Sequence, residues 1–258
     1  MNSNELFNSL FNDYEKYREQ KLNIEIIKHA DVVNLVNEIG EKEIFRIEMI
    51  GCSVEGREIF SISFGTGKTK ILAWSQMHGN ECTATAALFD ILNLFSAADI
   101  YNKFRTDLLS KTTFHFIPML NPDGAEKYKR ENAFNIDLNR DTLRLESPES
   151  EILWQYANKI QPAFAFNMHD QNSYYTAGRK NKTSAISLLA PPVDYAKSIN
   201  YVREKSMQVI CKVYEVLSNF IPGQIARYKD DFEPRAFGDN FTKKGISTIL
   251  VESGFYKG

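Results

Sequence analysis

Three side chains of this sequence could hold one metal ion. His78 and Glu81 form a His-x-x-Glu element, so an imidazole and a carboxylate can face the same cation, and His169 would supply a third ligand. Two histidines and a glutamate are the ligands of a catalytic zinc ion, which keeps an open position for a water whose pKa it lowers. A short His-x-x-Glu element also occurs by chance, and the alternative is the start of a helix with a solvated His and Glu.

Glu252 has the properties of a general base. It follows the apolar run Thr248-Ile249-Leu250-Val251, and a carboxylate at the end of a buried strand costs free energy unless it is paired or functional. Beside a metal-bound water it would accept a proton and later pass it to the leaving group. The alternative is a structural ion pair with an arginine.

A polar segment at residues 130–141 carries guanidinium and amide groups. Arg140 could hold a carboxylate through two parallel hydrogen bonds, and Asn139 could add another donor. Arg130 could place positive charge where an oxyanion develops, and Asp137 could accept the second ring N–H of a zinc-bound histidine. Taken alone, the segment is more simply interpreted as a polar loop.

The elements around these residues alternate between strands and helices. Short apolar runs predict strands at 70–74, 112–118, 163–168 and 246–251, and helical spacing predicts helices over 84–95, from Ser147-Pro148 onward and around 209–217. This alternation predicts an α/β sheet with helices on both faces, in which ligands bind beyond the carboxyl ends of the strands. Polar residues just after four strands are therefore expected to converge: His78, Asn121, His169 and Glu252.

The part of the chain before these strands has its own pattern. Apolar residues at helical spacing predict a helical segment over 1–42. Two β-type runs between Glu43 and Phe64, broken by Gly51 and by Glu55-Gly56, predict a hairpin. Because no linker or repeat follows, we expect one domain, with a catalytic unit over 43–258.

Composition excludes several classes of protein. The 258 residues are 43% hydrophobic and 25% charged, which excludes disordered and collagen-like chains, and a net charge of -2 gives no basic footprint for nucleic acid. Three scattered cysteines predict neither a disulfide framework nor a cysteine zinc site. With no secretory signal and no apolar run of 18 residues, we expect a cytoplasmic protein without a membrane partner.

Several ordered motifs together resemble the M14 zinc metallocarboxypeptidases, and most closely uncharacterised bacterial members of that family. The resemblance covers roughly residues 44–254 and rests on these motifs: Gly51-x-Ser53-x-x-Gly56-Arg57, His78-x-x-Glu81, Asn121-Pro122-Asp123-Gly124, Arg130, Asp137-x-Asn139-Arg140, His169 and Glu252. It implies a mixed, mostly parallel central sheet, one zinc ion and a peptide or peptide-like substrate with a free carboxylate.

The resemblance also implies a role for each motif residue. His78, Glu81 and His169 would bind zinc, and Glu252 would be the general base and acid. Arg130 would polarise the scissile carbonyl, and Asp137 would be the partner of His78. Asn139 and Arg140 would anchor the terminal carboxylate of the substrate. Tyr228 is the nearest candidate for the mobile tyrosine of the family.

Three departures from the family pattern are visible. The interval between Glu81 and His169 is shorter than in digestive members, so loops around the cleft are expected to be reduced. Asp141 follows Arg140 where many members carry Asn, and would add negative charge beside the carboxylate anchor. The sequence ends at Gly258, where the family usually continues with a packing helix, so a carboxy-terminal element is expected to be lacking.

The leading interpretation is a zinc metallopeptidase that removes a carboxy-terminal residue by attack of a zinc-bound water. The alternatives are a related amidohydrolase, either an N-acyl amino acid deacylase or a peptidoglycan-peptide amidase, and, with less support, a non-catalytic binding module. Specificity depends on Asp239. If it points into the side-chain pocket, a basic or amine-bearing residue is preferred; otherwise Asp239 is a helix N-cap.

Overall fold

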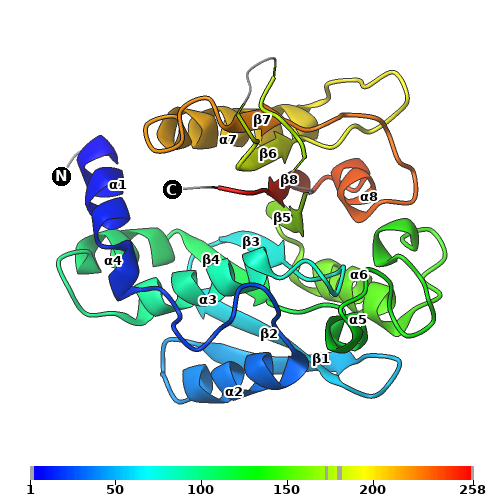
Figure 1. Cartoon of the computed structure of the whole chain (residues 1–258), viewed down its shortest axis with the longest axis horizontal. Helices are drawn as coiled ribbons and strands as arrows, with labels where there is room; N and C mark the ends of the chain where they lie inside the picture. The colour runs from blue at the N-terminus through cyan, green and yellow to red at the C-terminus, as the bar shows by residue number, and fades with distance from the viewer. Residues whose placement is uncertain (1–2, 172–173, 179–181, 257–258) are drawn as a thin grey trace.

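The structure, a computed structural model, describes residues 3–171, 174–178 and 182–256. Within these residues one eight-stranded sheet runs in the order β1-β2-β4-β3-β5-β8-β6-β7 (Figure 1). Its strands are β1 (Arg46–Cys52), β2 (Glu58–Gly65), β3 (Thr69–Trp74), β4 (Thr112–Ile117), β5 (Phe164–Asp170), β6 (Ile186–Leu189), β7 (Ile225–Arg227) and β8 (Ser247–Ser253).

The middle of the sheet is parallel. Strands β4, β3, β5 and β8 all run in one direction, while the β1–β2 hairpin and β6 join this block antiparallel, and β7 is parallel to β6. The prediction of a mixed, mostly parallel α/β sheet is confirmed. The carboxyl ends of β3, β5 and β8 therefore meet at one edge, where polar side chains from distant parts of the sequence can gather.

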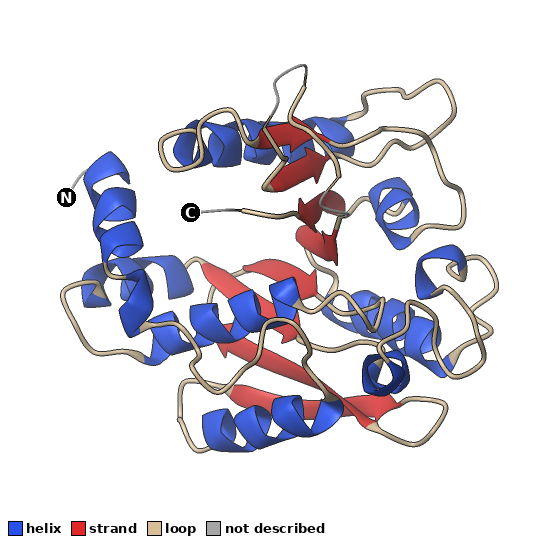
Figure 2. Ribbon diagram, viewed as in Figure 1, coloured by secondary structure: helices blue, strands red, loops and turns tan. Residues whose placement is uncertain are grey.

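Helices cover both faces of the sheet (Figure 2). On one face, α2 (His29–Gly40) and α3 (Thr83–Ser96) bury Leu35 and Leu88 against Phe116 of β4. On the other, α6 (Pro148–Ile160) and α8 (Phe237–Lys243) bury apolar side chains against Trp74 of β3. Each face of the sheet thus carries its own hydrophobic cluster. Strand residues alternate between the two clusters because successive side chains of a strand point to opposite faces.

The remaining helices lie around this framework. They are α1 (Ser3–Asn12), α4 (Asn102–Leu109), α5 (Pro122–Lys127), α7 (Tyr201–Leu217) and two 3₁₀ turns, Tyr14–Lys16 and Leu138–Arg140. The predicted amino-terminal helices correspond to α1 and α2. Among the described helices, none combines the length and apolar character that crossing a membrane requires.

Two local features were not predicted from the sequence. The Asn121-Pro122-Asp123-Gly124 stretch starts the short helix α5, whose N-cap Asn121 accepts a hydrogen bond from the Gly124 N–H. Pro122 stands at the start of this helix, where its missing N–H has no cost. Strands β6 and β7 were not predicted, because they are too short to show an alternating pattern.

Candidate metal site and active-site cleft

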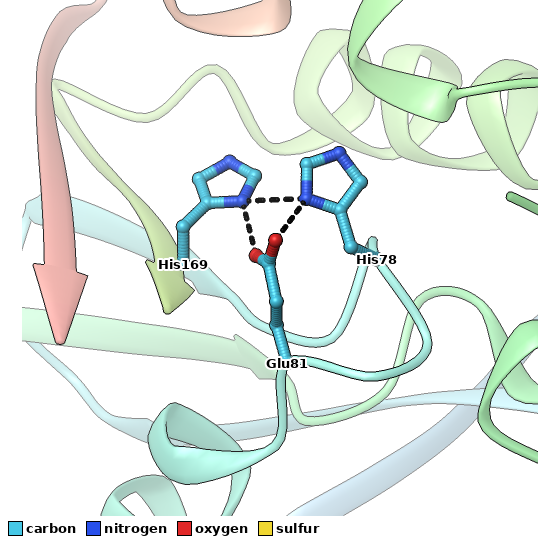
Figure 3. A group of neighbouring side chains, drawn as sticks. All are labelled: His78, Glu81 and His169. Atoms are coloured by element: carbon cyan, nitrogen blue, oxygen red, sulfur yellow. Dashed lines mark hydrogen bonds and ion pairs between the residues drawn. The ribbon is translucent and has the colours of Figure 1, made fainter. Parts of the chain in front are cut away.

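The three predicted metal ligands meet at the carboxyl ends of β3 and β5. His78 and Glu81 belong to the loop between β3 and α3, and His169 is near the end of β5 (Figure 3). Nδ1 of His78 lies 2.8 Å from Oε1 of Glu81, Nδ1 of His169 lies 2.8 Å from Oε2, and the two nitrogens are 3.0 Å apart. The three side chains are buried, and one ligand atom from each lies within 4.8 Å of the others.

These donor atoms fit a divalent cation. Nε2 of His78 lies 3.1 Å from Oδ1 of Asp137, which assigns the ring proton to Nε2 and leaves a lone pair on Nδ1. That lone pair faces Nδ1 of His169 and the Glu81 carboxylate. The three side chains therefore bring together more lone pairs than they have protons to share, as ligands of a cation do. Two imidazoles and one carboxylate are a zinc-type ligand set, and the residues present therefore fit zinc.

The protonation states of these groups depend on one another. Burial opposes the charge of Glu81, but the neighbouring histidines outweigh it and hold the pKa of its carboxyl well below the usual range. Burial likewise disfavours charge on Asp137, whose hydrogen bond with His78 nevertheless lowers its pKa. Both carboxylates are therefore ionised at neutral pH, as a cation site requires.

Arg130 reaches the same group from the 130–141 segment. Its Nε and Nη2 lie 3.1 and 3.0 Å from Oδ2 of Asp137, and its Nη1 lies 3.1 Å from Nδ1 of His78 and 3.2 Å from Oε1 of Glu81. Asp137 thus orients both His78 and Arg130, one with each carboxylate oxygen. Asp137 therefore fixes the position of one metal ligand, His78, and of the positive charge of Arg130 beside it.

Glu252 faces the metal ligands from the neighbouring strand. In the parallel β5–β8 pair, His169 is in register with Glu252, so the two side chains project from the same face of the sheet. Glu252 is buried, and burial raises the pKa of its carboxyl to about 7, with the charge of Glu81 adding to the shift. A carboxyl that exchanges its proton near neutral pH has the property that a general base needs.

A cavity of about 750 Å³ opens over this group. Of the residues to which a role was assigned, all line the cavity except Asp137, which contacts His78 and Arg130. The residues that line it include His78, Glu81, Arg130, Asn139, Arg140, Asn167, His169, Tyr228, Glu233, Asp239 and Glu252. Asn121 does not line the cavity, although the sequence pattern predicted that it would converge with the others.

The two predicted carboxylate anchors have protein partners in this structure. Nε of Arg140 lies 3.3 Å from Oε2 of Glu233, and its Nη1 donates to the Asn139 carbonyl. Oδ1 of Asn139 accepts a hydrogen bond from the Phe237 N–H at the start of α8. The amide NH2 of Asn139 is the group left to face a ligand, and Arg140 is half-exposed at the cavity.

Asp239 is not a helix N-cap, which corrects one of the two expectations for it. Ala236 caps α8, and Asp239 lies inside the helix, buried and lining the cavity. Burial raises the pKa of its carboxyl to about 7. Tyr228 lies just after β7, and burial, together with the charge of Glu252, raises the pKa of its phenol to about 12.

Asp141 does not add charge to the carboxylate anchor. Its buried carboxylate accepts hydrogen bonds from the Glu146 and Ser147 N–H groups and from Oγ of Ser147, so it closes the turn before α6. Asp141 does not line the cavity, whereas Arg140 does. Asp141 is structural.

The Asn121-Pro122-Asp123-Gly124 motif packs against the metal-binding loop and holds it in position. Nδ2 of Asn121 donates to the carbonyls of Met77 and Arg130, which ties the metal-binding loop to the 130–141 segment. A Cβ on Gly79 would lie 2.0 Å from the carbonyl carbon of Gly124, so the metal-binding loop and α5 can pack together only with glycine at position 79.

Asn167 and Glu233 also line the cavity and were not predicted from the sequence. The signal for Asn167 was available, because it stands two residues before His169 on a predicted strand and must share its face. Glu233 lies in an irregular segment between β7 and α8, where no periodic pattern assigns a side chain to a site.

Several solved structures share this fold. A metallo-carboxypeptidase from Burkholderia cenocepacia superposes with a TM-score of 0.74 at 15% identity, covering 90% of this chain and 61% of that one. Thrombin-activatable fibrinolysis inhibitor (TAFI) superposes with a TM-score of 0.74 at 14% identity, covering 99% of this chain and 73% of that one. At these identities the likeness establishes the fold.

Sequence relatives point to the same group. Carboxypeptidase 2 of Trichophyton rubrum is 32% identical over 112 residues, which are 43% of this chain and 20% of that protein. Carboxypeptidase E of Caenorhabditis elegans is 34% identical over 134 residues, covering 43% of this chain and 28% of that protein. A model of the zinc carboxypeptidase family (Peptidase_M14) matches residues 33–204, which include the three metal ligands. The chain belongs to the zinc carboxypeptidase family.

Proposed function

We propose that this protein is a zinc-dependent carboxypeptidase that hydrolyses the last peptide bond of a peptide or peptide-like substrate. The observation that carries the proposal is the register of Glu252 with His169. Glu252 is a buried carboxyl that projects from the same face of the sheet as His169 and lines the same cavity as the three metal-type ligands. Because the matched segments are a minor part of the curated relatives, activity and substrate are inferred from this site.

His78, Glu81 and His169 would hold the metal. Bound zinc supplies a Lewis acid and lowers the pKa of a coordinated water toward neutrality. The carboxylate of Asp137 accepts a hydrogen bond from Nε2 of His78 and so keeps the ring proton there, which leaves the lone pair of Nδ1 for a metal. Arg130 contacts Nδ1 of His78 and Oε1 of Glu81 in the present structure. If His78 and Glu81 held a metal, Nη1 of Arg130 would be available to donate a hydrogen bond to the substrate oxygen.

Glu252 would transfer the protons. As a carboxylate it accepts the proton of the attacking water, and as a carboxylic acid it returns that proton to the leaving amine. Arg130, held in place by Asp137, donates hydrogen bonds to the oxygen on which negative charge develops. Because charges are poorly screened in a buried site, the burial of this region strengthens the electrostatic interactions of Glu252 and of Arg130 with the substrate.

Asn139 and Arg140 would hold the terminal carboxylate of the substrate. Arg140 already contacts one carboxylate in the cavity, that of Glu233. A substrate carboxylate can replace Glu233 with two parallel hydrogen bonds. Tyr228 lines the same cavity with its phenol protonated at neutral pH, so it can donate a hydrogen bond to the substrate.

One experiment separates this function from the alternatives. Zinc content is measured first, and the loaded protein is then given peptides with free and amidated carboxyl ends, N-acyl amino acids and peptidoglycan stem peptides. A carboxypeptidase cleaves the free-acid peptides and leaves the amidated ones intact. Cleavage of N-acyl amino acids or stem peptides alone would replace the proposal with the amidohydrolase alternative. Zinc binding without any turnover would support the binding module.

The carboxylate anchor has a matched test. Arg140→Ala is expected to lower kcat/KM for free-acid peptides by about 100-fold or more, because a charge-assisted pair is lost. Arg144→Ala is the control, since Arg144 lies nearby in sequence, is exposed and contacts only Glu146 among the described residues. Equal kcat/KM in the two variants would remove Arg140 from substrate binding.

A further inference from the structure

Gln76 begins the metal-binding loop, residues 75–82, in a conformation that few side chains adopt. It lies shortly before His78 and Glu81 in the sequence, and its φ of 48° is in the left-handed region. This backbone conformation is unfavourable for a residue that has a Cβ, and it persists only where the surrounding structure holds it. The contacts of Gln76 therefore have to compensate for an unfavourable backbone beside the metal ligands.

The side-chain amide of Gln76 joins three segments of the chain. Its Nε2 donates to the carbonyls of Gly79 at 2.9 Å and of Ile27 at 3.0 Å, and its Oε1 accepts a hydrogen bond from the Thr85 hydroxyl at 2.9 Å. Gln76 is fully buried, so no water can replace these hydrogen bonds when they are lost. The amide thus ties the metal-binding loop to itself, to α3 and to the residues before α2.

The hydrogen bond to Gly79 bears on the spacing of the metal ligands. Gly79 lies between His78 and Glu81 in a turn that the Glu81 N–H closes by donating to the His78 carbonyl at 3.0 Å (Figure 3). Gln76 holds the carbonyl in the middle of this turn, and the backbone of Gly124 packs against the Cα of Gly79. Since metal ligands tolerate only small errors in position, a turn that is held in this way keeps the imidazole and the carboxylate ready for a cation.

The residues before α2 contact the metal-binding loop at both of its ends. At the first end Gln76 donates to the Ile27 carbonyl, and at the other end Sγ of Cys82 donates to the Ile24 carbonyl at 3.1 Å. Ile27 is 1% exposed and belongs to the apolar cluster under α2 and α3, so this part of the chain is itself fixed. Both ligands of the loop therefore lie between two points of attachment to residues 24–28.

We propose that Gln76 is a positioning residue of the metal site, which fixes the metal-binding loop against residues 24–28 and so holds His78 and Glu81 at ligand spacing before a metal binds. The inference rests on the metal site of the proposed function and is independent of the substrate. Gln76 does not line the cavity and acts only through the two ligands that follow it. A ligand pair that is already ordered binds a metal more tightly, because less conformational freedom is lost on binding.

Two replacements separate the amide of Gln76 from its backbone and its volume. Gln76→Gly adopts the left-handed φ freely but has no amide, and Gln76→Met keeps a long flexible side chain without the hydrogen bonds. In a competition titration against a zinc-binding dye, we expect both variants to bind zinc about tenfold or more weakly, as variants that lose an outer partner of a metal site do. Unchanged zinc affinity in Gln76→Gly would reduce the role of position 76 to its backbone, and unchanged affinity in Gln76→Met would reduce it to packing. Either result would overturn the proposal.

Tyr156→Phe is the matched control for a general loss of stability. Tyr156 is buried in α6, and its hydroxyl lies 2.6 Å from Oγ of Ser61 and 2.9 Å from Nδ1 of His115, so the variant also loses buried hydrogen bonds. Neither partner belongs to the metal-binding loop, and zinc affinity is expected to stay within about twofold of the unmodified protein. Melting curves show that each variant is folded. An equal loss of zinc affinity in Tyr156→Phe and in the Gln76 variants would assign the effect to stability and overturn the proposal.

Hydrogen exchange of the metal-free protein gives a measurement that does not depend on turnover. In Gln76→Gly the backbone amides of residues 76–82 should exchange faster than in the unmodified protein, because the loop opens more often, whereas Tyr156→Phe should leave them unchanged. Equal exchange of these amides in Gln76→Gly and the unmodified protein would overturn the proposal, even where peptide hydrolysis supports the proposed function. Faster exchange and weaker zinc binding in a protein that hydrolyses no peptide would support the role of Gln76 and contradict the proposed function.

Discussion

Glu252 and His169 occupy registered positions on the adjacent parallel strands β8 and β5. The backbone hydrogen bonds of the sheet therefore fix the general base relative to a metal ligand, and no loop has to close to bring them together. A site built on strands holds its groups more precisely than one built on loops. The separation of the two roles, metal binding and proton transfer, can be tested because each belongs to a different strand.

Replacing Glu252 by Gln should leave zinc bound and remove most of the turnover. Gln has the same shape but cannot accept a proton, so kcat is expected to fall by about 100-fold or more. Zinc content after dialysis and kcat on a free-acid peptide are the two measurements. Turnover near that of the unmodified protein would exclude Glu252 as the base, and loss of zinc would make it a ligand.

Asp137→Asn should weaken zinc binding. The Asn amide can present its NH2 to His78 and no longer secures the proton on Nε2, so a fall in zinc affinity of about 10- to 100-fold is expected. A competition titration against a zinc-binding dye measures it. Asp141→Asn is a useful comparison, because Asp141 is also buried in this segment but contacts only the turn before α6. Equal zinc affinities for the two variants would contradict the role of Asp137.

Asp123→Ala should destabilise the whole fold. Asp123 is fully buried at the start of α5, where it accepts hydrogen bonds from Oγ of Ser53 and the Glu55 N–H and pairs with Arg57 at 2.6 Å. It thereby holds the β1–β2 turn against the helix that supports the metal-binding loop. Each buried group that loses its hydrogen bond to Asp123 costs about 1–3 kcal/mol, and urea unfolding measures the loss.

The control for Asp123 is Glu55→Gln. Glu55 also pairs with Arg57, but its side chain is 35% exposed, and exposed pairs contribute about 0–1 kcal/mol. A free energy of unfolding that falls equally in both variants would show that burial of Asp123 does not matter. The hydrogen bonds of Asp123 with Ser53 and Glu55 also connect two motifs that are far apart in sequence.

The site residues that lie at strand ends could be predicted from the sequence. His78, His169 and Glu252 follow or terminate apolar runs, and parallel strands bring their ends to one edge, so convergence could be deduced without coordinates. Asn121 has the same sequence position relative to its strand but turns inward as the cap of α5. A strand end fixes where the backbone lies, whereas the hydrogen bonds of the following turn decide where the side chain points.

The part that could not be deduced depends on contacts between irregular segments. Glu233 reaches Arg140 from a stretch without periodic pattern, and Asp239 enters the cavity because α8 begins at Phe237, with Ala236 as its cap. A shift of the helix start by a few residues would have made Asp239 a cap with its side chain outside. Such boundaries are the least certain feature of a sequence pattern.

Asp239→Asn should stabilise the metal-free protein at pH 8 and have little effect at pH 4. Burial raises the pKa of this carboxyl to about 7, so the folded protein holds the proton more tightly than the unfolded chain. This contribution is fully present below the unfolded pKa, near 3.8, and is lost as pH rises through 7. Because Asn stays neutral, the free energy of unfolding at pH 8 is expected to rise by up to about 4 kcal/mol, the cost that corresponds to a pKa raised from 3.8 to about 7. Urea unfolding at both pH values measures it, and an equal effect at both would show that the charge of Asp239 carries no cost.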